Sequence, residues 1–451
     1  MVFSTIIFLF RFLPITLALY YLAPAKLKNT VLFLCSLVFY CWGEVRFFPV
    51  MVALILINYL SGLAIEHFDA KPALRRFFLL VALVGSLGML FYFKYANFVL
   101  RSANALLGTA FAEIQGIGTL PLGISFYTFQ TLSYSIDVYR RDVKAERNII
   151  DFGAYVVMFP QLIAGPIVKY RDVSDQLHVY KHRYNLKQIE EGMTLFTFGL
   201  AKKVLLADAV GALWTDIIGV ADSPSTTFVG LANASTPLVW LGIIAYSLQL
   251  YFDFSGYSDM AVGLGRMLGF EFMRNFNYPY FSRDIAEFWR RWHISLSSWV
   301  RDYLFLPLSS FTRRWGQWGV AASLMVTFIA LGVWHGAGWT FAVYGFIQGL
   351  VIVWELRTER IRNKVRKHIG RRLFATLSVI RTYLIFAVSL VFFKAQSVSD
   401  AFYFLRNISF QTHASWKEIN IGMSDHICIV AGAALLLMLL YDYLMSKRNQ
   451  H

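Results

Sequence analysis

Long apolar segments recur along nearly all of this chain of 451 residues and restrict the folds open to it. Inside a bilayer, backbone polar groups find no water, and the α-helix satisfies them within one segment. A helix needs about 20 apolar residues to cross. We therefore predict an all-α polytopic membrane protein with roughly 11–13 membrane segments, including short or re-entrant ones. The apolar segments lie at about 2–22, 30–42, 47–65, 77–97, 119–136, 150–168, 193–210, 236–256, 318–333, 340–354, 373–393 and 426–445.

The charge of the chain fits a membrane protein better than a nucleic-acid-binding one. Only 15% of residues are charged and the net charge is +15, whereas soluble domains carry about 25% charged residues. The Lys and Arg residues gather at the ends of apolar segments, as they do in cytoplasmic loops. The densest cluster, at 357–372, predicts an inside face there, an outside N-terminus and an external loop at 395–425. The same cluster is also suited to anionic membrane lipid.

No internal repeat and no Gly/Ser- or Pro-rich linker divides the chain. We therefore predict a single integral-membrane domain over residues 1–451. No stretch carries a metal-ligand set, and a bound metal or tightly bound cofactor is not expected. The sequence also lacks H-E-x-x-H, G-x-S-x-G and a phosphate-binding loop. Zinc-peptidase, serine-nucleophile and nucleotide-hydrolysing chemistry are therefore not indicated.

One histidine lies between two apolar runs, which is an unusual place for an ionisable group. His335 follows the run 318–333 and precedes the run 340–354. These arms of 16 and 15 residues would be about 24 and 22 Å long, short of the roughly 30 Å hydrocarbon core. His335 is thus expected at membrane depth, where ionisable groups usually line a functional cavity.

Two interpretations of His335 are open. It is either a core histidine bonded to a neighbouring helix or a general base that takes a proton from a hydroxyl. The small residues Gly336, Ala337 and Gly338 would let a substrate approach the backbone closely.

A second histidine, His293, lies in the basic, aromatic and amphipathic segment 287–301. One interpretation is an interfacial helix whose arginines face lipid headgroups. The other is a residue at a donor entrance, where Arg290 and Arg291 hold the phosphates of a cofactor.

Carboxylates and lysines also interrupt apolar segments. Asp253 and Asp259 close the run 236–256, where they need partners such as Arg266 or Arg283. Structural ion pairing is one interpretation and a role along a substrate tunnel is the other. Lys202 and Lys203 are expected to extend their charged ends toward water.

Several parts of the sequence carry a family pattern when they are taken together. They are the stretches 254–269, 275–280 and 288–304, Trp334-His335-Gly336, the stretch 160–166 and the Phe-rich N-terminus. In these parts the sequence resembles the membrane-bound O-acyltransferase (MBOAT) family, and within it the bacterial branch of the integral-membrane subunit of alginate O-acetylation. The similarity covers most of the chain and is specific through 252–340.

The resemblance implies a helical bowl around a central tunnel, with His335 as the deep catalytic histidine and His293 as the second one. It implies acyl transfer from a cytoplasmic thioester, acetyl-CoA or an acyl carrier protein, and an extracytoplasmic acetyltransferase partner that acts on a polysaccharide. The expected function is O-acetylation of an exopolysaccharide such as alginate, at a bacterial plasma (inner) membrane. Residues expected to bind donor or line the tunnel are Arg290, Arg291, Trp334, Asp253 and Asp259.

Two alternatives remain open. D-alanyl transfer from a carrier protein toward teichoic acid would use the same architecture but would not respond to acetyl-CoA. A transporter or flippase with His335 as a proton relay would move substrate without acyl transfer.

Overall fold

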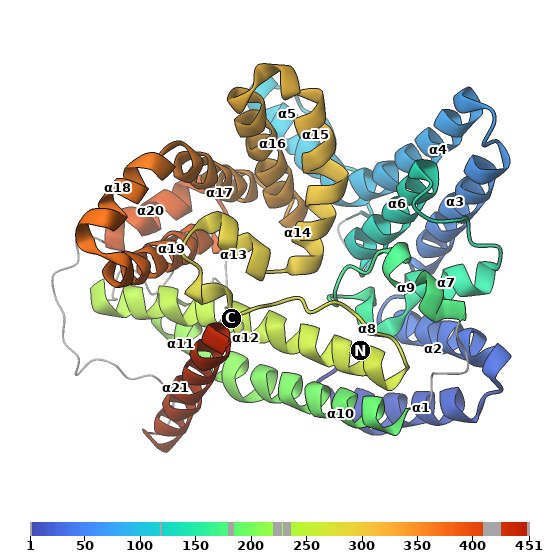
Figure 1. Cartoon of the computed structure of the whole chain (residues 1–451), viewed down its shortest axis with the longest axis horizontal. Helices are drawn as coiled ribbons and strands as arrows, with labels where there is room; N and C mark the ends of the chain where they lie inside the picture. Colours follow the sequence, from blue (N-terminus) through green and yellow to red (C-terminus); the bar gives the residue numbers. More distant parts are fainter. Residues whose placement is uncertain are drawn as a thin grey trace. The chain divides into compact units, whose positions relative to one another are not determined.

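The computed structural model describes residues 2–117, 120–178, 185–219, 228, 236–408 and 425–448. Every regular element in these ranges is a helix (Figure 1). The prediction of an all-α chain is therefore confirmed for the described residues.

Six helical stretches of the described chain are long and apolar enough to cross a membrane. Each coincides with a predicted segment, so the multi-pass prediction is confirmed. Other predicted segments form shorter helices, for example α2 (Lys28–Gly43) and α6 (Ile124–Arg140), and the number of crossings stays a prediction. The six are α3 (Phe48–His67), the run Pro72–Leu107 that begins with α4 (Pro72–Leu90), α12 (Thr236–Met267), α16 (Gln317–His335), α17 (Trp339–Arg357) and α19 (Arg371–Lys394).

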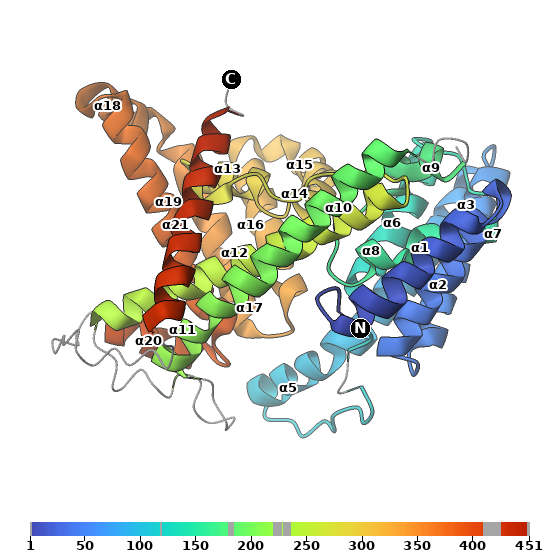
Figure 2. The same ribbon diagram turned by 90° about the horizontal axis from the view of Figure 1, so that it is seen from below.

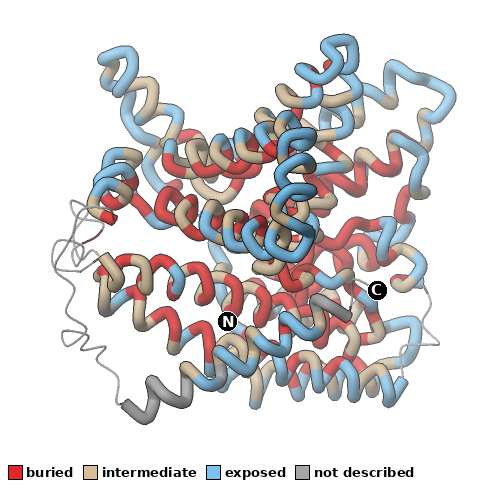
Figure 3. The backbone as a smooth tube through the Cα atoms, turned by 60° about the vertical axis from the view of Figure 1, so that its left-hand side comes forward, coloured by how far each residue is buried: buried red, intermediate tan, exposed pale blue. Residues whose placement is uncertain are grey.

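Much of this apolar surface is exposed in the protein itself. In the run Pro72–Leu107, only 17% of the most apolar window is buried. Buried, intermediate and exposed residues alternate along the helices (Figure 3). Exposed apolar side chains on long helices fit lipid contact, since monomeric soluble proteins rarely expose large apolar patches.

The chain divides into two compact units, which are described separately. The first comprises residues 1–200 and 257–274, and the second comprises 201–256 and 275–451. The chain thus passes between them at residues 200, 256 and 274. The single-domain interpretation of the whole chain stays a prediction.

Buried polar side chains connect the helices of the first unit. The amide of Asn58 on α3 donates to the Ser86 hydroxyl on α4 at 2.8 Å and accepts from the Ser135 hydroxyl on α6 at 2.8 Å. These three helices lie side by side (Figure 1). The segment 257–274 belongs to the same unit, where the Tyr20 and Tyr21 hydroxyls donate to the carbonyls of Leu268 and Met267.

In the second unit, α16 and α17 form a helical hairpin that packs through glycine. A Cβ at Gly345 would lie 2.2 Å from the carbonyl oxygen of Phe328, and one at Gly332 would lie 2.2 Å from the carbonyl oxygen of Phe341. The two backbones therefore touch, as small residues allow in membrane helix pairs.

Most of the basic cluster lies on a short helix between two apolar helices. It is α18 (Glu359–Ile369), which follows α17 and leads into α19 (Figure 2). The predicted external loop begins with a helix, α20 (Val398–Ile408), and its residues 409–424 lie outside the described residues.

Candidate functional site

His335 is the last residue of α16, and α17 begins four residues later at Trp339. The predicted hairpin is confirmed, but both helices have 19 residues instead of 16 and 15. They are about 28 Å long, so they fall short of the roughly 30 Å core by less than the apolar runs indicated, and the depth of His335 stays a prediction. The His335 side chain is partly exposed, and its ring lies 4.8 Å from that of Trp334 and 5.3 Å from that of Phe393.

The glycine after His335 does not provide room for a substrate. A Cβ built at Gly336 would lie 2.1 Å from the ring of Phe341. The space at that position is therefore filled by an aromatic side chain of α17, and the sequence interpretation of Gly336 was wrong. At Gly338, the nearest atom is 3.5 Å away, which is ordinary contact.

His293 lies at the junction of two short helices, α13 (Ile285–Arg291) and α14 (Ile294–Val300). Its side chain is 1% exposed and its φ is 44°. The segment 287–301 is therefore not one interfacial helix, and the headgroup-facing interpretation of His293 was wrong. Aromatic rings pack beside this junction: the Phe386 ring of α19 lies 4.2 Å from that of Phe288 and 5.3 Å from that of Trp292.

Contacts from α13 to α17 hold this junction. The indole N–H of Trp289 donates to the Gln348 side chain at 3.2 Å, and the backbone N–H of Ile285 donates to the Glu355 carboxylate at 2.9 Å. Glu355 also forms an ion pair with Arg381 of α19. α17 therefore holds α13 directly, and α19 holds the Glu355 carboxylate that accepts from it.

The two histidines share one aromatic neighbour. The Trp334 ring lies 6.4 Å from the His293 ring, and the Phe254 ring lies 4.7 Å from it. Burial lowers the pKa of His293 well below 6.5, and positive charge on His335 lowers it further. His293 is thus a neutral imidazole at physiological pH, and the structure brings together His293, Trp334 and His335.

We expect acid to destabilise the protein through His293. The unfolded chain takes up a proton below its pKa near 6.5, whereas the folded chain holds this imidazole neutral until the pH reaches the depressed value. The resulting stability is complete above pH 6.5 and is lost as the pH falls from there. Thermal unfolding in detergent should show a fall in Tm with acidification that is shallower in His293→Gln. Equal slopes would contradict this.

A cavity of about 410 Å³ lies beside these helices in the second unit. Arg290 is exposed at its edge and makes no ion pair within the described part of the chain. Arg291 instead pairs with Glu287 at 2.6 Å. Of the two predicted arginines, Arg290 alone lines the cavity. Its lining is Ala286, Trp289, Arg290, Ile294, Ser297, Ser298, Val300, Arg301, Phe305, Leu324, Thr327, Phe328, Leu331 and Ile352.

Neither of the two predicted aspartates is among the residues that line this cavity. Asp253 is 2.5 Å from the ammonium of Lys203, so its partner is neither Arg266 nor Arg283. Arg266 pairs with Glu191 at 3.1 Å. Asp259 lies in the part of α12 that belongs to the first unit. For Asp253 the ion-pair interpretation is supported, and a tunnel role stays a prediction for both.

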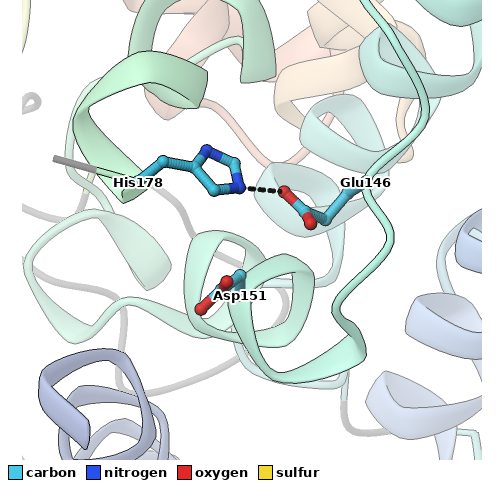
Figure 4. Close-up of side chains that lie close together, drawn as sticks. All are labelled: Glu146, Asp151 and His178. Carbon is cyan, nitrogen blue, oxygen red and sulfur yellow. Dashed lines mark ion pairs between the residues drawn. The ribbon is translucent and has the colours of Figure 1, made fainter. Parts of the chain in front are cut away.

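The first unit holds a cluster of ligating side chains, Glu146, Asp151 and His178, whose ligand atoms lie within 4.8 Å of one another (Figure 4). The Glu146 carboxylate is 3.2 Å from Nε2 of His178 and accepts from the Tyr170 hydroxyl at 2.6 Å. Asp151 accepts from two asparagine amides at 2.6 and 2.9 Å. These bonds already satisfy the carboxylates, so the cluster is a structural network.

Sequence reasoning missed the hydrogen-bond partners of His293. The Asn275 side-chain oxygen lies 3.2 Å from its Nδ1, and Ser295 lies beside both. Asn275 stands between Arg274 and Phe276, and no local pattern in this stretch indicates that its amide is buried beside a histidine.

Comparisons with known proteins agree with this architecture. The model of the membrane-bound O-acyltransferase family matches residues 140–397. A probable alginate O-acetylase of Azotobacter vinelandii is 44% identical over 86% of this chain and 75% of its own length. A peptidoglycan O-acetyltransferase of Helicobacter pylori is 33% identical over 90% and 80%. A teichoic acid D-alanyltransferase of Streptococcus thermophilus is 30% identical over 55% and 60%.

Proposed function

Because this chain belongs to the membrane-bound O-acyltransferase family and is an acyltransferase, we propose that it moves an acetyl group from a cytoplasmic thioester across the membrane for O-acetylation of an exopolysaccharide such as alginate. The observation that carries the proposal is that the Trp334 ring lies next to two histidines, the buried and neutral His293 and the partly exposed His335. The similarity to alginate O-acetylases over most of the chain supports the acetyl group and the polysaccharide class. The proposed location is the bacterial plasma (inner) membrane.

The proposed chemistry uses His335 as a general base. Its neutral imidazole takes the proton of the attacking hydroxyl as the new C–O bond forms at the thioester carbonyl. Collapse of the tetrahedral intermediate breaks the C–S bond, and the proton passes from His335 to the leaving thiolate. An acyl-histidine intermediate is not required. An extracytoplasmic acetyltransferase partner then transfers the acetyl group from this ester to a hydroxyl of the polysaccharide.

Arg290 is the proposed contact for the donor phosphates. It stands at the edge of a cavity with a mostly apolar lining, which suits a donor with an anionic head and a slender arm. Either acetyl-CoA or an acyl carrier protein would present that arm, because both bear phosphate and a thioester. Acetyl-CoA is the donor that we expect.

Replacing this arginine should weaken donor binding and leave the chemistry intact. We expect Arg290→Gln to raise KM for acetyl-CoA about tenfold with little change in kcat, since a charge-assisted hydrogen bond contributes about 1.5–3 kcal/mol. Steady-state kinetics in liposomes measure this. Arg283→Gln is the matched control because Arg283 is exposed and does not line the cavity. An unchanged KM in Arg290→Gln would remove this residue from the donor site.

The test of the function is transfer of radiolabel from acetyl-CoA by the purified protein in liposomes, with partner and acceptor supplied. Release of label from CoA by the wild type supports the proposal. An inert wild type under these conditions shows that acetyl-CoA is the wrong donor.

The alternative is D-alanyl transfer from a carrier protein toward teichoic acid. It is favoured only by the similarity to a teichoic acid D-alanyltransferase, which covers 55% of this chain. Transfer from a D-alanyl carrier protein, with no response to acetyl-CoA, would support it.

A further inference from the structure

The orientation of the Asn275 side chain is fixed by a neighbour that can only donate. Asn275 is 2% exposed, and its side-chain oxygen lies 3.0 Å from the backbone nitrogen of Ser295. A backbone N–H has no acceptor capacity, so the amide atom that faces it must be the oxygen. The Ser295 hydroxyl donates to the same oxygen at 2.9 Å.

This orientation determines which nitrogen of His293 carries the proton. The Asn275 oxygen also lies 3.2 Å from Nδ1 of His293. An amide oxygen only accepts, so Nδ1 must donate, and a neutral imidazole has a single N–H. The contact of 3.4 Å between Nδ1 and the Ser295 hydroxyl oxygen fits the same assignment. Nε2 therefore bears a lone pair.

That lone pair has no hydrogen-bond partner in the part of the chain that the structure describes, although Nε2 is buried. Buried polar atoms are nearly always bonded, and an exception calls for a ligand or a function. A bare imidazole nitrogen next to aromatic rings is suited to a hydrogen-bond donor on a bound substrate.

The backbone around His293 holds this arrangement against strain. Its φ of 44° is left-handed, which costs energy for a residue with a Cβ. Two backbone bonds of 2.9 Å, from Ile294 to the Asn275 carbonyl and from Asn277 to the Arg291 carbonyl, tie the two segments together. Asn275 and His293 are thus held as one unit.

We propose that Asn275 is a positioning residue that holds His293 in its Nδ1–H tautomer, so that Nε2 accepts a hydrogen bond from substrate. The substrate part rests on the proposed acyl-transfer function, whereas the tautomer does not. Losing the Asn275 acceptor would free the imidazole to carry its proton on Nε2, which would then present a donor instead of an acceptor.

The direct test is nitrogen-15 NMR of histidine-labelled full-length protein in lipid vesicles. The chain has nine histidines, and the signals of His293 are those that His293→Gln removes. The expected wild-type signals show a protonated Nδ1 and a bare Nε2. In Asn275→Leu a substantial Nε2–H population should appear, whereas Asn275→Asp should keep the Nδ1–H form. A protonated Nε2 in the neutral wild type, or an unchanged tautomer in Asn275→Leu, overturns the proposal.

Kinetics then separate positioning from folding. We expect kcat to fall at least about tenfold in Asn275→Leu and to be largely recovered in Asn275→Asp, since only the latter retains the acceptor. Gln348→Leu is the control for stability, because Gln348 bonds Trp289 and Ser389 in the same unit. It should keep the Nδ1–H form. A fall in kcat that Asp does not rescue would assign Asn275 a structural role alone.

The pH profile gives a third readout. A carboxylate at position 275 favours the charged form of His293 and so raises the pKa of this imidazole. In Asn275→Asp the acid limb of the curve of kcat against pH should therefore move to higher pH. Among the described residues, His335 is the titratable group whose charge acts on His293. An acid limb at the same pH as in the wild type would contradict the contact between residue 275 and His293. If the wild type transfers no acetyl group, the proposed function fails, but the NMR result still decides the tautomer.

Discussion

His335→Ala should slow acyl transfer by orders of magnitude while the protein still folds. A positioned general base contributes about 10²- to 10⁴-fold to a rate, so we expect a loss in that range. The side chain is partly exposed at the end of α16, and its removal leaves no large buried void. Transfer of radiolabel from acetyl-CoA in liposomes is the measurement, with thermal unfolding in detergent as the check on folding.

The matched control for this prediction is His368→Ala. His368 is an exposed histidine on the basic helix α18, and its replacement should leave the rate unchanged. Full activity in His335→Ala would exclude His335 as the base and leave it as a packing residue between Trp334 and Phe393. Loss of folding would make the variant uninformative about chemistry, and His335→Gln would then take its place in the assay.

Gly345→Ala should unfold or severely destabilise the hairpin that carries His335. The added methyl would lie 2.2 Å from the Phe328 carbonyl oxygen and 3.0 Å from the Cα of Ile329, both backbone atoms that side-chain rotation cannot move. Overpacking of this kind costs about 1–3 kcal/mol, and more where a backbone must shift. We expect a lower Tm and loss of transfer together.

The control is the same substitution at a glycine with open space. A Cβ at Gly88 in α4 meets nothing within 4 Å. Gly88→Ala should therefore be neutral or stabilising by about 0.5–1 kcal/mol, because alanine loses less entropy in a helix. Equal Tm changes in the two variants would show that α16 and α17 do not require this close approach.

The hairpin around His335 was predictable because its signal is local. Two apolar runs separated by Gly336 and Gly338 specify two helices and a turn, whatever surrounds them. The bounds were less certain, since polar residues such as Gln317 and Arg357 extend the helices beyond the apolar runs. Those extra residues changed the estimated depth of His335.

The environment of His293 was not predictable from its own segment. Its basic and aromatic neighbours suggest one interfacial helix, but at the break before α14 the backbones of Arg291 and Ile294 bond to Asn277 and Asn275. The partner of Asp253 was missed for the same reason. Lys203 precedes it by 50 positions, and only tertiary packing brings the two side chains together. Contacts between distant segments have no local signature.

The interleaved order of the two units has a consequence for biosynthesis. The ribosome delivers residues 201–256 of the second unit before residues 257–274 complete the first. Until then, Tyr20 and Tyr21 lack the carbonyls of Leu268 and Met267 that accept their hydroxyl protons in the finished protein. The first unit can therefore complete its packing only after residues 257–274 have been synthesised. We expect a fragment ending at residue 200, which lacks them, to be prone to aggregation or proteolysis.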